Sequence, residues 1–180
     1  DVLTKAIGSE KPARVREYLL RQLRHAGGTG DETMAALAPL LTDEYLADHA
    51  ARSILMTGKK DAAALFRTAL PEATGQPRVV IIQALGRLRD GASLPAILKD
   101  TASEDEAIRR AAVYAASAIG DPSATAAIRA AVQKATGQEK GEMTDNYLLF
   151  IRRLGEEDHA EKAAALCRAL MKERPEEDQV

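Results

Sequence analysis

The sequence is poor in aromatic residues, lacks tryptophan and has one cysteine, Cys167, among its 180 residues. One cysteine can form neither an internal disulfide nor a cluster of thiolate zinc ligands. No apolar run approaches the roughly 20 residues that span a bilayer. Lysine and arginine total 25 against 27 aspartates and glutamates, so the basic excess typical of sequence-independent nucleic-acid binding is missing. These absences argue against membrane insertion and against a nucleic-acid partner.

What the sequence does contain is a repeat. Residues 78–132 hold the same pattern twice, displaced by 31 residues: an apolar helix, a short break and a second helix. The aligned pairs include Val80 with Ala111, Leu85 with Ala116, Asp90 with Asp121, and Ile97 with Ile128. A fixed period of this length indicates a stacked helical repeat. Abundant alanine suits such thin two-helix layers, because small side chains let helices approach closely.

Helical periodicity on either side extends the pattern to about five two-helix units. We expect them at residues 11–41, 42–74, 77–102, 105–136 and 141–173, in one domain over residues 1–174 that a polar tail, 175–180, follows. A loop is expected at 135–141. The local expectations are Val15 and Tyr18 on a buried apolar face, Asp31 and Thr42 as helix caps, Pro39 as a kink or stop, and Gly155 in the place of Gly120.

The first residues, Asp1 to Gly8, have the apolar spacing of a helix that ends at a glycine. We therefore expect this chain to be a piece of a longer protein. Any targeting segment would then lie upstream, so the compartment cannot be read from the sequence.

Two segments carry a family resemblance. Residues 115–124 (AASAIGDPSA) and 84–92 (ALGRLRDGA) resemble the turn of bacterial HEAT-like repeats, which are also seen in phycobilin lyases. Residues 46–70 are similar to a repeat of such arrays in large exported bacterial proteins. The resemblance covers 46–128 well and the flanks more loosely. It implies a right-handed, armadillo-like α-α superhelix within a larger bacterial protein, with a concave groove lined by the second helix of each unit.

The family that these segments resemble includes scaffolds and adaptors, lyases, DNA-alkylation glycosylases and metal-dependent hydroxylases. The hydroxylase branch carries His-Glu pairs as iron ligands, and this chain has no such pair. The few aromatic residues and the balanced charge argue against a lyase or a glycosylase, since both need to hold a flat ring or a base.

Single residues with chemical potential have plainer explanations. Gly27 to Gly30 lacks the preceding strand and the Lys-Ser/Thr of a phosphate loop, so we interpret it as a turn. The three histidines lie in different units, and a structural role is favoured for His49, which falls on the buried stripe. The remaining assignments are Asp100, Asp105 and Glu106 at helix ends, Cys167 as a half-buried apolar residue, and Arg78, Arg109 and Arg110 on a solvated face.

We therefore predict a non-catalytic protein-interaction or scaffolding module that needs no cofactor or metal and has no evident small-molecule substrate. Its partner would be a protein or peptide, bound on an extended surface of second helices. The residues that the repeat register places there are Arg67, Leu98, Lys99 and Arg129. The alternatives are a HEAT-like enzyme or nucleic-acid-binding domain, and a spacer that only holds neighbouring domains apart.

Overall fold

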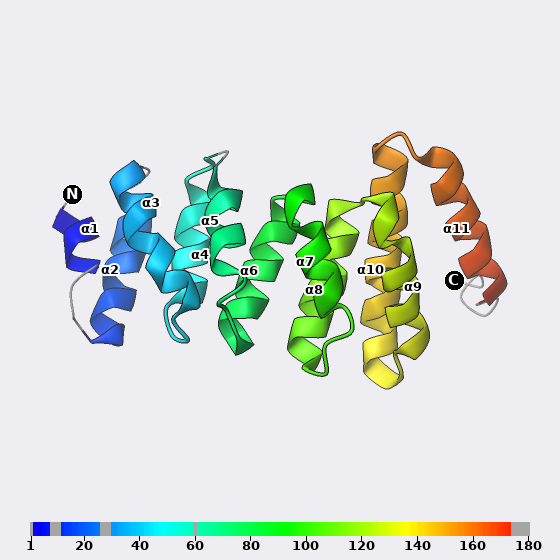
Figure 1. The fold of residues 1–180 in the computed structure, drawn as a ribbon, viewed down its shortest axis with the longest axis horizontal. Helices are drawn as coiled ribbons and strands as arrows, with labels where there is room; N and C mark the ends of the chain where they lie inside the picture. Colours follow the sequence, from blue (N-terminus) through cyan, green and yellow to red (C-terminus); the bar gives the residue numbers. More distant parts are fainter. Residues whose placement is uncertain (1, 8–11, 26–29, 60, 174–180) are drawn as a thin grey trace. The chain divides into compact units, whose positions relative to one another are not determined.

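The computed structural model describes residues 2–7, 12–25, 30–59 and 61–173, and these are helical with no strand among them. Consecutive helices pack as two-layered pairs, in the manner of an α-α solenoid (Figure 1). The all-α class predicted from the sequence is confirmed. The residues group into two compact units, Asp1–Leu88 and Arg89–Val180, which we describe separately.

Unit 1 contains two layers of helices. One layer is formed by α2 (Ala13–His25), α4 (Ala47–Met56) and α6 (Gly75–Arg87), in which α4 packs between the other two. The other layer is formed by α1 (Val2–Ile7), α3 (Asp31–Leu37), a 3₁₀ turn η1 (Ala38–Thr42) and α5 (Ala62–Ala69). The largest fully buried side chains of this unit include Leu20, Leu41, Ile54, Phe66 and Ile81.

Unit 2 repeats the arrangement. Its first layer is formed by α8 (Glu106–Ile119) and α10 (Gly137–Glu156), which pack along each other. Its second layer is formed by α7 (Leu94–Asp100), α9 (Thr125–Lys134) and α11 (Ala160–Glu173), with 3₁₀ turns η2 (Gly91–Ser93) and η3 (Pro122–Ala124) before α7 and α9. The boundary between the two compact units falls inside the third expected repeat, between α6 and α7. The single domain over 1–174 stays a prediction.

The helices largely fall where the repeat pattern places them. The predicted stop at Pro39 is confirmed, because α3 ends at Leu37 and gives way to η1. The predicted loop at 135–141 is wrong, because α10 begins at Gly137. The tetrapeptide Ala-Thr-Gly-Gln explains this start: it occurs at residues 73–76 and 135–138, and both copies place glycine at positive φ at the first residue of a helix. The polar tail lies outside the described residues.

Three local expectations fail, each for a different reason. Asp43 rather than Thr42 accepts the backbone N–H groups before α4, those of Tyr45 and Leu46. Asp31 is not a cap but the first residue of α3, with its carboxylate on Lys59. On α2, Leu20 and Leu23 are buried, whereas Val15 and Tyr18 are exposed.

The core of unit 2 is formed where α8 packs between its neighbours. The predicted stripe Ile108, Ala111, Ala112, Ala115 and Ile119 is buried, and so are the alanines and the valine between them. Because most of these side chains are methyl groups, the helix axes can approach closely. Close approach leaves little room at the point where α8 ends.

Gly120 ends α8 in the left-handed conformation, at φ 78°. A Cβ built on Gly120 would lie 2.6 Å from the Arg153 Cβ of α10, so glycine is required here by space as well as by φ. The expectation that Gly155 repeats this role is wrong. The helix α10 continues through Gly155 to Glu156, and Asp158 takes the left-handed conformation instead, at φ 61°.

We expect Gly120→Ala to lower the free energy of unfolding by about 2–4 kcal/mol, from positive-φ strain plus the contact with Arg153. Gly137→Ala is the matched control, since Gly137 has φ 56° and nothing within 4 Å of a built Cβ. It should cost about 1 kcal/mol, the strain alone. Urea unfolding measures both, and equal losses would contradict the close contact.

Candidate interaction surfaces

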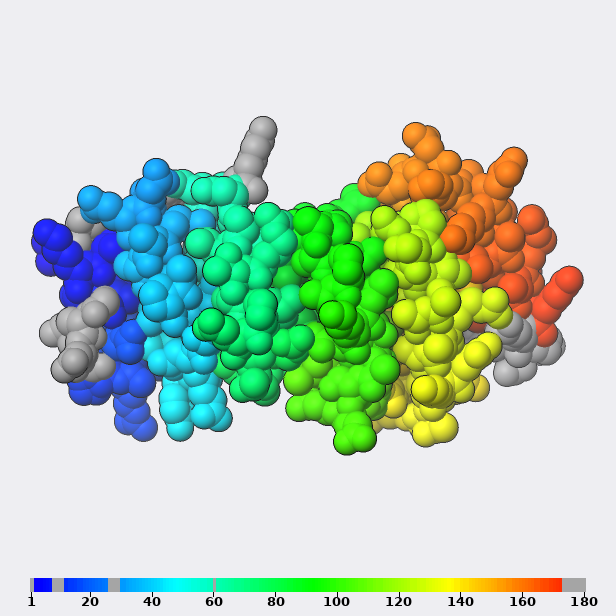
Figure 2. Space-filling model, viewed as in Figure 1, coloured from blue at the N-terminus to red at the C-terminus, as the bar shows by residue number. Residues whose placement is uncertain are grey.

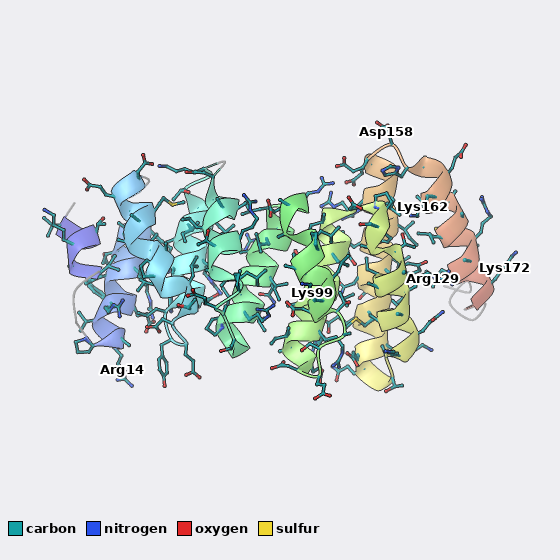
Figure 3. The ribbon with its side chains drawn as sticks, in the orientation of Figure 1. Arg14, Lys99, Arg129, Asp158, Lys162 and Lys172 are labelled. Atoms are coloured by element: carbon teal, nitrogen blue, oxygen red, sulfur yellow. The ribbon has the colours of Figure 1, made fainter. Side chains whose placement is uncertain are left out.

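The four residues predicted to bind a partner are divided between the two units. Arg67 lies in the last turn of α5 in unit 1 and is exposed. Leu98 and Lys99 lie on α7 and Arg129 on α9, both of which pack against α8 in unit 2. Lys99 is exposed, while Leu98 and Arg129 are half-buried. Unit 2 thus presents Lys99 and Arg129 on the same layer of helices (Figure 3), and the single row that would include Arg67 stays a prediction.

The cations of this layer differ in their partners. Arg67 and Arg129 each interact with another residue. Lys99 and Lys134, in the last turns of α7 and α9, have no hydrogen bond or ion pair with any residue that the structure describes. Lys134 borders a groove of about 400 Å³ between α9 and the loop after α7, whose floor includes Ala127, Ala131 and Met143. Figure 2 shows the face on which α7 and α9 are exposed.

Charges at the start of the first helices are used differently. Arg109 binds Glu139 of α10 through Nη2, at 3.0 Å, and donates to the Ser103 carbonyl oxygen, at 2.9 Å. Arg110 pairs with Glu142 of α10. These two ion pairs link α8 to α10 at the same end, so both arginines hold the layer together and are not a solvated face.

The carbonyl contact recurs at the repeat spacing. Arg78, 31 residues before Arg109, donates to the carbonyl oxygens of Leu70 and Ala73, at 2.8 and 3.2 Å. Arg16, two periods before Arg78, donates to the Ile7 carbonyl oxygen, at 3.0 Å. In each case the guanidinium binds the backbone at or after the end of a preceding helix, where carbonyls lack partners within that helix. This repeated arginine is therefore part of the fold.

The three acidic residues considered for acid–base chemistry lie at helix ends, and one of them is a cap. Asp105 accepts the N–H groups of Ala107 and Ile108, which confirms it as the cap of α8. Glu106 lies in the first turn of α8, as expected. Asp100, in contrast, is the last residue of α7, where a negative charge does not complement the helix dipole.

Among the other single residues, His49 of α4 lies with Nε2 3.4 Å from Glu17 Oε1 of α2, so it joins two helices of unit 1. Its Nδ1 is buried and has no partner among the described residues. Cys167 is exposed, which corrects the half-buried placement, because the stripe of α11 buries its neighbour Leu166 instead. Most of the Gly27 to Gly30 turn lies outside the described residues.

The 3₁₀ turns of unit 2 are closed by aspartates in equivalent positions. Asp90 accepts the Ser93 N–H at 3.0 Å. Asp121 accepts the Ser123 N–H at 2.8 Å and the Ser123 hydroxyl at 2.6 Å. These bonds, the hydroxyl first, lower the pKa of Asp121, and the positive charges of His159 and Lys162 add to the shift. Lys162 also donates to the Pro122 carbonyl oxygen, which fastens α11 to this turn.

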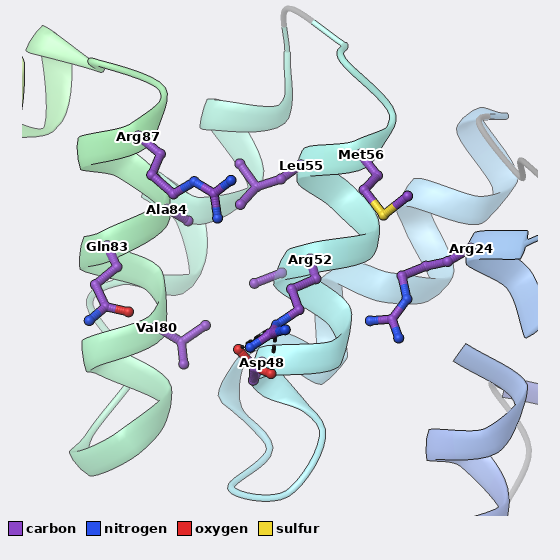
Figure 4. A pocket seen from close by; sticks show the side chains of 10 residues that line it. Arg24, Asp48, Arg52, Leu55, Met56, Val80, Gln83, Ala84 and Arg87 are labelled. Carbon is purple, nitrogen blue, oxygen red and sulfur yellow. Dashed lines mark hydrogen bonds and ion pairs between the residues drawn. The ribbon is translucent and has the colours of Figure 1, made fainter. Parts of the chain in front are cut away.

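Unit 1 contains a surface that the repeat register did not indicate. A groove of about 570 Å³ lies between α2, α4 and α6. We call it the arginine groove, because Arg24 of α2, Arg52 of α4 and Arg87 of α6 extend into it (Figure 4). Among the described residues of its lining, Asp48 is the one carboxylate, and it pairs with Arg52. The 31-residue offset aligns Arg24 with Leu55, so no repeat marks these arginines in the sequence.

Among the described residues, no group of three or more His, Cys, Asp or Glu side chains could hold a metal ion. None of the described helices is both long enough and apolar enough to cross a membrane.

Residues 69–142 match the family of HEAT repeats, over the stretch from the end of α5 into α10. The two copies of the 31-residue pattern lie inside this match, so the resemblance to HEAT-like repeats is confirmed for that part of the chain. No curated protein matches the sequence. The likeness to phycobilin lyases and the larger bacterial parent stay predictions.

We expect Arg109→Met to lower the free energy of unfolding by about 2–3 kcal/mol, because it leaves Glu139 and the Ser103 carbonyl without a half-buried partner. Arg110→Met is the control on the same helix. Its pair with Glu142 is more exposed, so the loss should be about 1 kcal/mol or less. Urea titration measures the loss in free energy of unfolding for both variants. A loss in Arg109→Met that is no larger than the loss in Arg110→Met would show that Arg109 does not anchor the turn.

A second prediction concerns pH. Because the folded state lowers the pKa of Asp121, its carboxylate stabilises the fold above the ordinary pKa of about 4, and this stability is lost as pH falls through the lower folded pKa. Asp121→Asn should therefore lower the free energy of unfolding by about 1 kcal/mol at pH 7. This loss should become smaller as the pH falls below about 4. Thermal melts of both proteins from neutral to acid pH measure the difference, and a difference that does not change with pH would contradict the ionised cap.

Proposed function

We propose that this chain is a non-catalytic protein-interaction module, which binds a protein or peptide on its second helices. The match to HEAT repeats supports this, since repeats of this kind are commonly interaction modules. We define the second-helix surface as Leu98, Lys99, Arg129 and Lys134 of unit 2. Arg67 occupies the equivalent position in unit 1.

The lysines of this surface are available to a partner, in contrast to the arginines at the start of α8, and Lys134 also lies beside a groove with an apolar floor. At the start of α8, Arg109 and Arg110 are consumed by ion pairs to α10. On the second helices, Lys99 and Lys134 have no partner among the described residues. A charge that the fold does not need can pair with a partner's charge without first breaking an internal contact.

The shape of the same surface suits a binding role. Alanines of α9 leave a shallow groove whose floor includes Met143, a side chain that can adapt to different apolar contacts. Lys134 stands at its border, and the half-buried Leu98 adds apolar area on α7. In this proposal a partner places apolar side chains against the alanines, and the lysines fix its orientation and speed its association.

The absence of catalysis is part of the proposal. It is supported by the engagement of Asp105 and Asp121 in caps, since a carboxylate that accepts two hydrogen bonds of the fold is poorly placed to exchange protons with a substrate. No cofactor is invoked.

The test is affinity capture from lysate of the source cells, followed by a measured Kd for each protein retained. We expect Lys99→Glu/Lys134→Glu to raise the Kd at least tenfold, because charge reversal replaces attraction with repulsion. Lys140→Glu/Lys172→Glu is the control, with the same change in net charge on two exposed lysines that have no partner among the described residues.

The control should stay within about twofold of the native Kd, and circular dichroism should show that both variants fold. If no retained protein distinguishes the two variants, the second-helix surface is not the binding surface.

A further inference from the structure

The arginine groove of unit 1 collects cations that helix packing does not use. Arg24 and Arg87 have no hydrogen bond or ion pair with any described residue. Arg52 binds Asp48 through Nε, at 2.9 Å, so that pair does not use its two terminal nitrogens. Three guanidinium groups thus share a groove with one carboxylate (Figure 4), and the mutual repulsion of like charges favours a bound anion.

The lining between these cations is mixed, since the exposed Gln83 adds a polar side chain to it. A buried floor is formed by Ala51, Val80 and Ala84. Met56 of α4, which is 67% exposed, offers an accessible apolar side chain, and the half-buried Leu55 lies next to it in the chain. An occupant that places an aliphatic side chain against Leu55 and Met56 would bury apolar area on both sides. The groove therefore offers apolar contact flanked by positive charge.

The size and composition of the groove narrow the occupant further. A volume of about 570 Å³ lies within the roughly 300–1,000 Å³ of ligand sites, which suits a few side chains rather than a domain surface. None of the described residues that line the groove is aromatic, so these residues offer a base nothing to stack on. Unit 1 carries 12 lysines and arginines against 10 aspartates and glutamates, an excess too small for a nucleic-acid backbone.

The dipoles of α2 and α6 disfavour a dianionic phosphate more than a singly charged carboxylate. Arg24 and Arg87 lie in the last turns of α2 and α6, so the groove faces the negative ends of these helices rather than amide donors. Dianionic phosphate groups favour the opposite, positive ends. Two singly charged carboxylates, each on one planar guanidinium, fit this arrangement, because arginine and carboxylate match in geometry.

We propose that the arginine groove binds an acidic segment of a partner protein, with carboxylates on Arg24 and Arg87 and an aliphatic side chain against Leu55 and Met56. This site is separate from the second-helix surface. It gives the module a binding site on its first helices as well, with its own preference for acidic sequence.

The experiment titrates the full chain into a short fluorescent peptide of repeated Glu-Glu-Leu and follows fluorescence anisotropy. The same titration uses a Gln-Gln-Leu peptide and a fluorescent oligothymidine. The groove variant is Arg24→Gln/Arg87→Gln. The matched variant is Arg14→Gln/Arg168→Gln, which removes two exposed arginines outside the groove and leaves the same net charge.

We expect saturable binding of the acidic peptide, no binding of the Gln-Gln-Leu peptide, and a Kd raised at least tenfold in the groove variant but within about twofold in the matched variant. Arg24→Lys/Arg87→Lys should lie in between, because lysine keeps the charge without the planar fork. Thermal melts confirm that each variant is folded.

An equal loss of affinity for the acidic peptide in the groove variant and the matched variant would overturn the proposal, because the peptide would then bind through general attraction to positive charge. The proposal would also be overturned if binding of the acidic peptide did not saturate at about 1 mM of the chain. Arg24 and Arg87 would then serve only to complement the helix ends. Tighter binding of oligothymidine through the same arginines would assign the groove to nucleic acid instead. None of these results depends on Lys99 and Lys134, so this proposal and the second-helix surface can fail separately.

Discussion

The close packing of alanine-rich helix faces is the constraint on which the rest of unit 2 depends. On α8, Ala112, Ala115 and Ala116 are fully buried, so the neighbouring helices pack against side chains of a single methyl group there. This close packing makes Gly120 obligatory where α8 ends beside Arg153 of α10. Because methyl groups bury little area each, such a layer gains less hydrophobic stabilisation per residue than a core of large side chains. The turns must then be held by polar contacts.

Those polar contacts explain why charge along the sequence is a poor guide to function here. Arg16, Arg78 and Arg109 recur in register and bind backbone carbonyls at or after the ends of preceding helices. In a repeat fold, a charge that returns at the period has the same environment in each copy, so the simplest role for it is one that every copy needs. The binding surfaces proposed above rest instead on cations without a partner among the described residues, Lys99 and Lys134 in unit 2 and Arg24 and Arg87 in unit 1.

The sequence predicted the class and most helices because these depend on local signals: period, caps and glycine at turns. It failed where the outcome depends on contacts across the chain. Tyr18 is exposed although it fits the apolar period of α2, and α10 continues past Gly155 to Glu156. Periodicity alone encodes neither outcome. The second-helix surface was predictable as a row of equivalent positions. Which of its cations have partners was not, since Arg129 interacts with another residue and Lys99 does not.

The arginine groove could not be predicted from the sequence either. Arg24, Arg52 and Arg87 share no register position, and each alone resembles an ordinary surface arginine at or near a helix end. Only the packing of α2, α4 and α6 brings them to one groove. Arg24 and Arg87 do share one structural role, since each complements the dipole at the end of its helix. That role does not explain why Arg52 of α4 lies in the same groove, so the proposal rests on the convergence of the three arginines rather than on any one of them.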